Sequence, residues 1–130
     1  MTAPKILAFA GSTRTESFNK KLIRVAAAAA REAGAEVTLI DLRDLKLPLY
    51  DQDDEEAHGL PPGALKLKEL MGTHDGLLIS APEYNSSLPA VLKNAIDWAS
   101  RKATPDEPAL QSFTGKVAGL MSASPGALGG

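Results

Sequence analysis

The chain has 130 residues, of which 14 are Lys or Arg and 16 are Asp or Glu, so its formal net charge is −2 at pH 7. This near balance argues against a basic nucleic-acid-binding surface and gives no reason to expect a membrane partner. Hydrophobic residues make up 44% and charged residues 23%, as in ordinary globular domains, which excludes disorder and collagen-like repeats. The absence of cysteine excludes disulfides, thiolate metal sites, iron–sulfur clusters and a cysteine nucleophile.

The chain also shows no sign of membrane insertion or export. No apolar run approaches the roughly 18 residues that a membrane span needs. Residues 1–5 contain no basic stretch, long apolar stretch or small-residue cleavage site of the kind that a secretory signal has. We therefore expect a cytoplasmic protein.

The first predicted element is a strand over residues 6–10, a wholly apolar run that suits a strand buried on both faces of a parallel sheet. A helix follows, with Ser17 as its N-cap and Gly34 at its end, where a left-handed residue is favoured. The apolar face of this helix is formed by Leu22, Ile23, Ala26, Ala27, Ala30 and Ala33. Residues 36–42 alternate and are β-branched, which predicts a second strand.

Residues 45–63 are predicted to form a loop, because prolines and a cluster of carboxylates interrupt any periodicity. The cluster consists of Asp51, Asp53, Asp54, Glu55 and Glu56. Grouped carboxylates suit hard metal ions, but the spacing of an EF-hand is absent. We favour a solvated surface loop, and we expect no metal site.

The second half of the chain continues the alternation. A short helix is predicted over residues 62–71 and a third buried strand over residues 76–81. The most regular helix begins near Ser87, with Pro89 as its first helical residue, where the missing N–H costs nothing. Its apolar stripe is formed by Leu88, Val91, Leu92, Ala95, Ile96 and Ala99. Residues 116–122 are predicted to form a fourth strand.

This alternation of strands and helices predicts an α/β fold in which helices cover both faces of a doubly wound parallel sheet. We expect residues 1–130 to form a single domain. The sequence stops in a glycine-rich stretch, residues 124–130, that would normally lead into a helix. We therefore expect a domain that is incomplete at its C-terminus and truncated after the fourth strand.

Ligands of open α/β sheets bind beyond the carboxyl ends of the strands, so the loops there are candidate sites. The first loop, residues 11–19, combines a glycine turn, hydroxyl groups, Arg14 and a helix N-terminus, which together favour an anion. It has neither the Gly-Lys-Ser/Thr ending of a Walker loop nor the glycines of a dinucleotide fingerprint. A monophosphate therefore fits it best; the alternative is a polar turn capped by Ser17.

The other two loops suggest contacts with a planar ring. In residues 81–87, Pro82 stiffens the turn, Tyr84 offers a flat apolar face, and Asn85 supplies donors and an acceptor. The glycines of residues 122–130 let backbone approach a ligand closely. The alternatives are an ordinary turn with a half-buried tyrosine and a flexible chain end.

Four segments occur here in a specific order: Gly11-Ser12-x-Arg14-x-x-Ser17-x-Asn19, Pro82-Glu83-Tyr84-Asn85, Leu92-Lys93-Asn94-Ala95-Ile96-Asp97-Trp98 and Ser124-Pro125-Gly126. In this combination the chain resembles the NADPH-dependent FMN reductase family of flavodoxin-like proteins, which includes quinone, chromate and azo-dye reductases. The resemblance runs from Ile6 to Gly130.

The resemblance implies a flavodoxin-like fold, FMN as cofactor, and NADPH or NADH as electron donor. It assigns the FMN phosphate to Ser12, Arg14, Ser17 and Asn19, one flank of the isoalloxazine to Pro82, Glu83, Tyr84 and Asn85, and its other side to Ser122, Ser124 and Gly126. It further implies a homodimer or homotetramer, and a further helix, strand and helix beyond the fourth strand.

The implied activity is hydride transfer from a nicotinamide through bound FMN to a quinone-like or other small acceptor. No Ser–His–Asp arrangement is present, and no residue is predicted to be catalytic. The alternatives are an FMN-binding electron carrier that does not oxidise NADPH and an inactive fragment of such an enzyme. Carriers of that kind are usually strongly acidic, which the charge of −2 does not match.

Five further side chains that invite functional interpretations are expected to be structural. We predict surface or capping roles for His58 and His74. We predict that Trp98 packs in the core or at a subunit interface, and that Lys93 and Arg101 lie on a solvated helix face.

Overall fold

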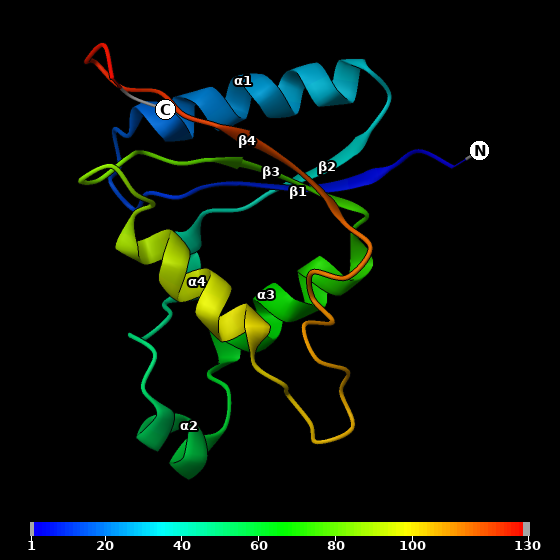
Figure 1. Cartoon of the computed structure of the whole chain (residues 1–130). Coiled ribbons are helices and arrows are strands. Elements are labelled where there is room, and N and C mark those ends of the chain that lie inside the picture. The colour runs from blue at the N-terminus through cyan, green and yellow to red at the C-terminus, as the bar shows by residue number, and fades with distance from the viewer. Residues whose placement is uncertain (1, 129–130) are drawn as a thin grey trace.

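The computed structural model describes residues 2–128 as a four-stranded parallel sheet with helices on both faces (Figure 1). The strands are β1 (Lys5–Ala10), β2 (Glu36–Leu39), β3 (Gly76–Ser80) and β4 (Val117–Met121), in the spatial order β2-β1-β3-β4. Helix α1 (Phe18–Glu32) covers one face, and α3 (Pro62–Thr73) and α4 (Ala90–Ser100) cover the other. The predicted α/β fold with a doubly wound parallel sheet is confirmed.

The order of the strands determines where a ligand can bind. The chain runs from β1 out to β2, then crosses back to β3 on the other side of β1. Such a reversal leaves a crevice at the carboxyl ends of the central strands. Those ends are level, because Ala10 pairs with Ser80 and Ser80 with Met121. The loops after β1, β3 and β4 therefore open at the same edge.

Each face of the sheet has its own core. Leu7 and Phe9 of β1 join Leu77 and Ile79 of β3 under α3 and α4. Small side chains, Ala8 and Ala10, face α1 on the opposite side and let that helix pack closely. Along β1, large side chains thus face α3 and α4, and small side chains face α1.

The helix ends mostly match the sequence. Ser17 caps α1 by accepting hydrogen bonds from the N–H groups of Asn19 and Lys20, and Gly34 follows the helix with φ of 100°. Pro89 was expected to be the first helical residue of α4, but it lies just before the helix in extended conformation, at ψ 152°. The difference is one residue.

The second predicted strand and the following loop required correction. β2 ends at Leu39, and Leu42–Leu45 form a 3₁₀ helix that Asp41 caps. Within the predicted loop, residues Gln52–His58 form the exposed helix α2, with Asp51 as N-cap. Acidic residues in its first turn stabilise it through the helix dipole. Within residues 2–128, no group of three or more His, Cys, Asp or Glu could hold a metal ion.

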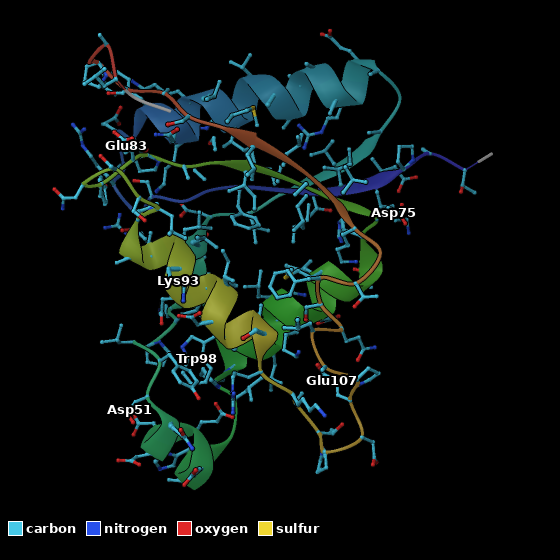
Figure 2. All side chains as sticks on the ribbon, in the orientation of Figure 1. Asp51, Asp75, Glu83, Lys93, Trp98 and Glu107 are labelled. Atoms are coloured by element: carbon cyan, nitrogen blue, oxygen red, sulfur yellow. The ribbon has the colours of Figure 1, made fainter. Side chains whose placement is uncertain are left out.

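Trp98 anchors α4 to the segment before α2 (Figure 2). It is 1% exposed and donates from Nε1 to the carbonyl of Pro48 at 2.7 Å, which confirms the predicted core position. Arg101 is exposed, as predicted, and its Nε donates to both Glu55 carboxylate oxygens, at 2.8 and 3.0 Å. That hydrogen bond holds the pKa of Glu55 below its usual value despite partial desolvation. Lys93 pairs with Asp97 on the exposed side, as expected.

The two histidines also have structural positions. His58 is exposed at the end of α2. His74 follows α3, with Nδ1 2.6 Å from the carbonyl of Leu70 and Nε2 2.8 Å from Oγ1 of Thr38. The predicted surface and capping roles are confirmed.

Strand β4 is an edge strand within the described residues, since it pairs with β3 alone. Its Val117 is 80% exposed and its Leu120 is 76% exposed. The long irregular segment before it is tied to α3, where Lys68 forms a 2.5 Å ion pair with Glu107. None of the described helices has the length and hydropathy to cross a membrane.

Candidate functional site

A cavity of about 230 Å³ opens at the carboxyl edge of the sheet, and all three predicted loops contribute to its walls. It is lined by Ser12, Arg14, Ser17, Phe18, Asn19, Pro82, Glu83, Tyr84, Ala123, Ser124 and Pro125. Sites that enclose a whole ligand usually measure about 300–1,000 Å³. A ligand of nucleotide size would therefore fill this cavity and extend beyond it.

The first loop presents hydroxyl groups whose protons are free to donate. Ser12 and Ser17 are each 5% exposed. Oγ of Ser12 accepts from the N–H of Arg14 at 3.3 Å, and Oγ of Ser17 accepts from the N–H groups of Asn19 and Lys20 at 3.2 and 3.4 Å. Since these oxygens act as acceptors within the protein, their hydroxyl protons remain for a ligand. The N-terminus of α1 adds a favourable dipole for an anion.

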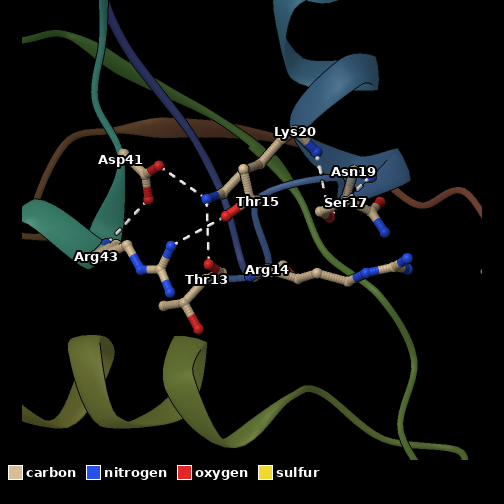
Figure 3. A network of polar contacts seen from close by, with 9 residues as sticks. Thr13, Arg14, Thr15, Ser17, Asn19, Lys20, Asp41 and Arg43 are labelled. Atoms are coloured by element: carbon tan, nitrogen blue, oxygen red, sulfur yellow. Dashed lines mark hydrogen bonds and ion pairs between the residues drawn. The ribbon is translucent and has the colours of Figure 1, made fainter.

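Arg14 supplies a positive charge at the same cavity. Its side chain is exposed, and no carboxylate of residues 2–128 lies within salt-bridge distance of it. Figure 3 shows it extending away from the neighbouring contacts of Lys20 and Asp41. A guanidinium in this position can form two parallel hydrogen bonds with phosphate oxygens.

The Asn19 side chain is engaged with the third loop. Its Oδ1 accepts from the N–H of Ala123 at 3.0 Å, and its Nδ2 donates to the carbonyl of Ala123 at 3.1 Å. The residue is 2% exposed. Asn19 thus joins the first loop to the third by a contact that was not predicted.

The second loop forms a tight hairpin. Tyr84 and Ser87 exchange two backbone hydrogen bonds, of 2.9 and 3.1 Å, across Asn85 and Ser86. Both central residues have positive φ, 53° and 64°. This is the φ pattern of a type I′ turn, which is uncommon without glycine and marks a conformation held by its surroundings. The N–H groups of Asn85 and Ser86 take no part in the two hairpin bonds.

The walls around the hairpin are flat and apolar. Pro82 and the 54%-exposed Tyr84 lie on one side, and Phe18 and Pro125 contribute further apolar surface. Figure 2 shows Glu83 at this end of the sheet, near the start of α1. Phe18 was not predicted, although a large aromatic residue directly after a helix cap was the available signal.

The third loop brings two more serines to this edge. Oγ of Ser124 accepts from the N–H of Gly126 at 3.1 Å, which again leaves its proton free. Oγ of Ser122 is buried without a hydrogen-bond partner in the described part of the chain. Buried polar atoms are usually paired, so the unpaired hydroxyl of Ser122 is an exception at this edge of the sheet.

The structure therefore gathers most of the predicted site residues into one place. Three of them, Asn85, Ser122 and Gly126, lie in the loops but do not line the cavity itself. Gly11 is needed for packing, because a Cβ there would lie 3.0 Å from Cβ of Ala81 and 3.2 Å from Cβ of Leu92. Hydroxyl donors, a guanidinium and a helix N-terminus fit a terminal phosphate, and the apolar walls fit a planar ring. The residues present thus fit FMN.

Comparison with known proteins agrees with this geometry. The family model for NADPH-dependent FMN reductase matches residues 4–130. The chain is 39% identical to the NAD(P)H-dependent FMN reductase PA1204 of Pseudomonas aeruginosa, over 96% of this chain and 62% of that protein. It is 41% identical to a 2-hydroxy-1,4-benzoquinone reductase from a Burkholderia species, over 98% of this chain and 64% of that protein.

A solved structure shows the same likeness. The flavoenzyme NAD(P)H:(acceptor) oxidoreductase FerB from Paracoccus denitrificans superimposes with a TM-score of 0.76 at 34% identity. The match covers 96% of this chain and 63% of FerB, so the chain spans less than two thirds of the length of these relatives. Because the family model spans residues 4–130, the chain belongs to the NADPH-dependent FMN reductase family.

Proposed function

We propose that this chain is an FMN-dependent oxidoreductase that takes electrons from NADPH or NADH and passes them to quinone-like or other small acceptors. The observation that carries the proposal is one cavity in which free hydroxyl donors, the N-terminus of α1 and Arg14, which has no carboxylate partner within residues 2–128, meet beside apolar walls. The names of the relatives support the choice of donor and acceptor.

The phosphate of FMN is assigned to the first loop. Ser12 and Ser17 donate their hydroxyl protons to its oxygens, and Arg14 forms charge-assisted hydrogen bonds with it from the solvent side. Asn19 contributes by holding Ala123 against the start of α1, which fixes the distance between the first and third loops.

The isoalloxazine ring is assigned to the space between the second and third loops, beyond the mouth of the cavity. Pro82 and Tyr84 pack along it, Glu83 and Asn85 lie at its edge, and Ser122, Ser124 and Gly126 border its other side. When bound, FMN would supply the hydride-transfer chemistry between a nicotinamide and an acceptor. The task of this chain is to hold the ring, to hydrogen-bond its edge and to leave one face open.

We further propose that residues 1–130 act as one domain, that the protein works in the cytoplasm, and that it assembles as a homodimer or homotetramer. The exposed edge strand β4, with Leu120 76% exposed, supports association, since an unpaired strand edge is a template for pairing with another chain.

The test is a spectroscopic titration of the purified chain. FMN and riboflavin are added separately to apoprotein, and binding is followed by flavin fluorescence. Holoprotein is then mixed anaerobically with NADPH or NADH, and the flavin absorbance is recorded before and after addition of a benzoquinone. We expect tighter binding of FMN than of riboflavin, bleaching by a nicotinamide, and recovery of absorbance with the quinone.

Two results would overturn the proposal in different ways. Equal affinity for FMN and riboflavin would remove the phosphate from the first loop. Tight FMN binding without bleaching by either nicotinamide would indicate an electron carrier.

A further inference from the structure

Lys20 is a buried cation that the proposed function does not use. Its side chain is only 10% exposed, although it lies in the first turn of α1 beside the candidate phosphate loop. Its Nζ pairs with Oδ2 of Asp41 at 2.8 Å and donates to the carbonyl of Thr13 at 3.3 Å (Figure 3). A lysine is rarely buried unless its charge has a defined partner.

The bond to Thr13 fixes the orientation of a peptide group in the phosphate loop. In a trans peptide the C=O and the following N–H point in opposite directions. With the Thr13 carbonyl held by Lys20, the N–H of Arg14 points the other way, where it donates to Oγ of Ser12. Ser12 is thereby left with its proton free for a ligand.

Asp41 connects this contact to a second one. Its Oδ1 accepts from the N–H of Arg43 at 2.9 Å, and the guanidinium of Arg43 donates from Nη1 to Oγ1 of Thr15 at 3.1 Å. Partial burial acts to raise the pKa of Asp41, but hydrogen bonds from Lys20 and Arg43 outweigh it and lower the pKa. The carboxylate therefore stays charged at neutral pH. The loop is thus held at Thr13 by Lys20 of α1 and at Thr15 by Arg43 of the segment that follows β2.

The ion pair borders a cavity. This cavity, of about 250 Å³, lies between α1 and the segment after β2, and its lining includes Lys20, Arg24, Asp41 and Asp44. The position of the Lys20 ammonium group is therefore set by its contacts with Asp41 and Thr13.

We infer that Lys20, Asp41 and Arg43 form a brace behind the phosphate loop, and that this brace sets the affinity for the FMN phosphate without touching it. Lys20 and Asp41 are thus positioning residues. This inference rests on the proposed function, because it assigns the phosphate to the first loop.

Substitution of Asp41 distinguishes the brace from a simple effect of charge. Asp41→Asn removes a negative charge near the phosphate, so Coulomb attraction alone predicts tighter FMN binding. The brace predicts weaker binding, by about tenfold, the scale of one lost charge-assisted hydrogen bond. Riboflavin, which has no phosphate, should change less than about twofold by the same reasoning. Fluorescence titration of apoprotein with both flavins measures this.

A double variant and a matched control sharpen the experiment. Lys20→Met with Asp41→Asn should bind FMN no worse than Asp41→Asn alone, because both changes break one unit. Lys21→Met removes an exposed cation from the same turn, whose pair with Glu16 is 3.8 Å long, and should leave the FMN-to-riboflavin ratio nearly unchanged. If Asp41→Asn does not fold, Thr15→Val tests the second contact at an exposed position without a change of charge. Thr15→Val should weaken the binding of FMN more than the binding of riboflavin.

The outcomes separate the two levels of the argument. If the unsubstituted chain does not prefer FMN to riboflavin, the proposed function fails. If it does, but Asp41→Asn binds FMN as tightly or more tightly, or loses both flavins equally, the brace is overturned.

Discussion

At the scale of single residues, removal of the Arg14 side chain should weaken ligand binding without changing the stability of the fold. It is exposed and has no salt-bridge partner among residues 2–128, so removing it should not disturb the fold. We predict that Arg14→Ala weakens FMN binding by about 1.5–3 kcal/mol, the range for a hydrogen bond to a charged group. Fluorescence titration measures the change. Arg24→Ala is the control, because Arg24 is an exposed arginine of α1 that does not line the cavity. Unchanged affinity would remove Arg14 from the phosphate site.

Asn19 should behave in the opposite way, since its amide is committed to the protein. Asn19→Ala leaves the N–H and carbonyl of Ala123 without their partner. Loss of a buried hydrogen-bond partner costs about 1–3 kcal/mol. We predict that much loss in the free energy of unfolding of apoprotein, measured by urea denaturation. Weakened FMN binding with unchanged apoprotein stability would instead make Asn19 a direct phosphate ligand.

At the scale of elements, α3 contains two glycines with opposite surroundings. A Cβ at Gly63 would lie 1.9 Å from the carbonyl oxygen of Leu45, whereas a Cβ at Gly72 would meet nothing within 4 Å. Gly63→Ala should therefore destabilise the protein by about 1–3 kcal/mol through overpacking. Gly72→Ala should stabilise it by about 0.5–1 kcal/mol through helix propensity. Thermal or urea denaturation of the pair gives the comparison, and equal effects would contradict the close packing of α3 on Leu45.

The elements also show how far the sequence could be followed. Short apolar runs such as residues 6–10 identified the strands, because a strand buried on both faces of a parallel sheet is apolar throughout and these runs are too short for helices. Helix α2 was not predicted, although Asp51 followed by acidic residues is typical of a helix start. Prolines on both sides of this polar stretch favour a loop instead. The last residues of the second predicted strand were wrong because Asp41 caps a 3₁₀ turn instead.

The site was predictable only in part, because some of its contacts are local in the sequence and others are not. Loop chemistry is local, so the hydroxyls and Arg14 could be read from residues 11–19 alone. The contact of Asn19 with Ala123 joins residues 104 positions apart, and the burial of Lys20 depends on Asp41 from another crossover. Such partners are set by the packing of the sheet, which no single segment encodes.

At the scale of the whole molecule, the exposed edge of β4 should govern association. Unpaired N–H and C=O groups beside apolar side chains form a template for another strand, and lysine on such an edge discourages pairing. We predict that Leu120→Lys shifts the chain toward the monomer at high concentration, with a change of stability within about 0.5 kcal/mol, as for other exposed positions. Light scattering across a dilution series measures the shift.

Leu49→Lys is the matched control, since Leu49 is 81% exposed but lies in the segment before α2 and not on the edge strand. If both substitutions alter association equally, the effect comes from added charge. If neither does, β4 is not the associating surface.

The two hydrogen bonds between the Asn19 side chain and Ala123 have a consequence for biosynthesis. Since one wall of the cavity comes from residues 123–125, which follow β4, a nascent polypeptide cannot complete this cavity until those residues have left the ribosome. The cavity is thereby completed only after all four strands of the described sheet have been synthesised.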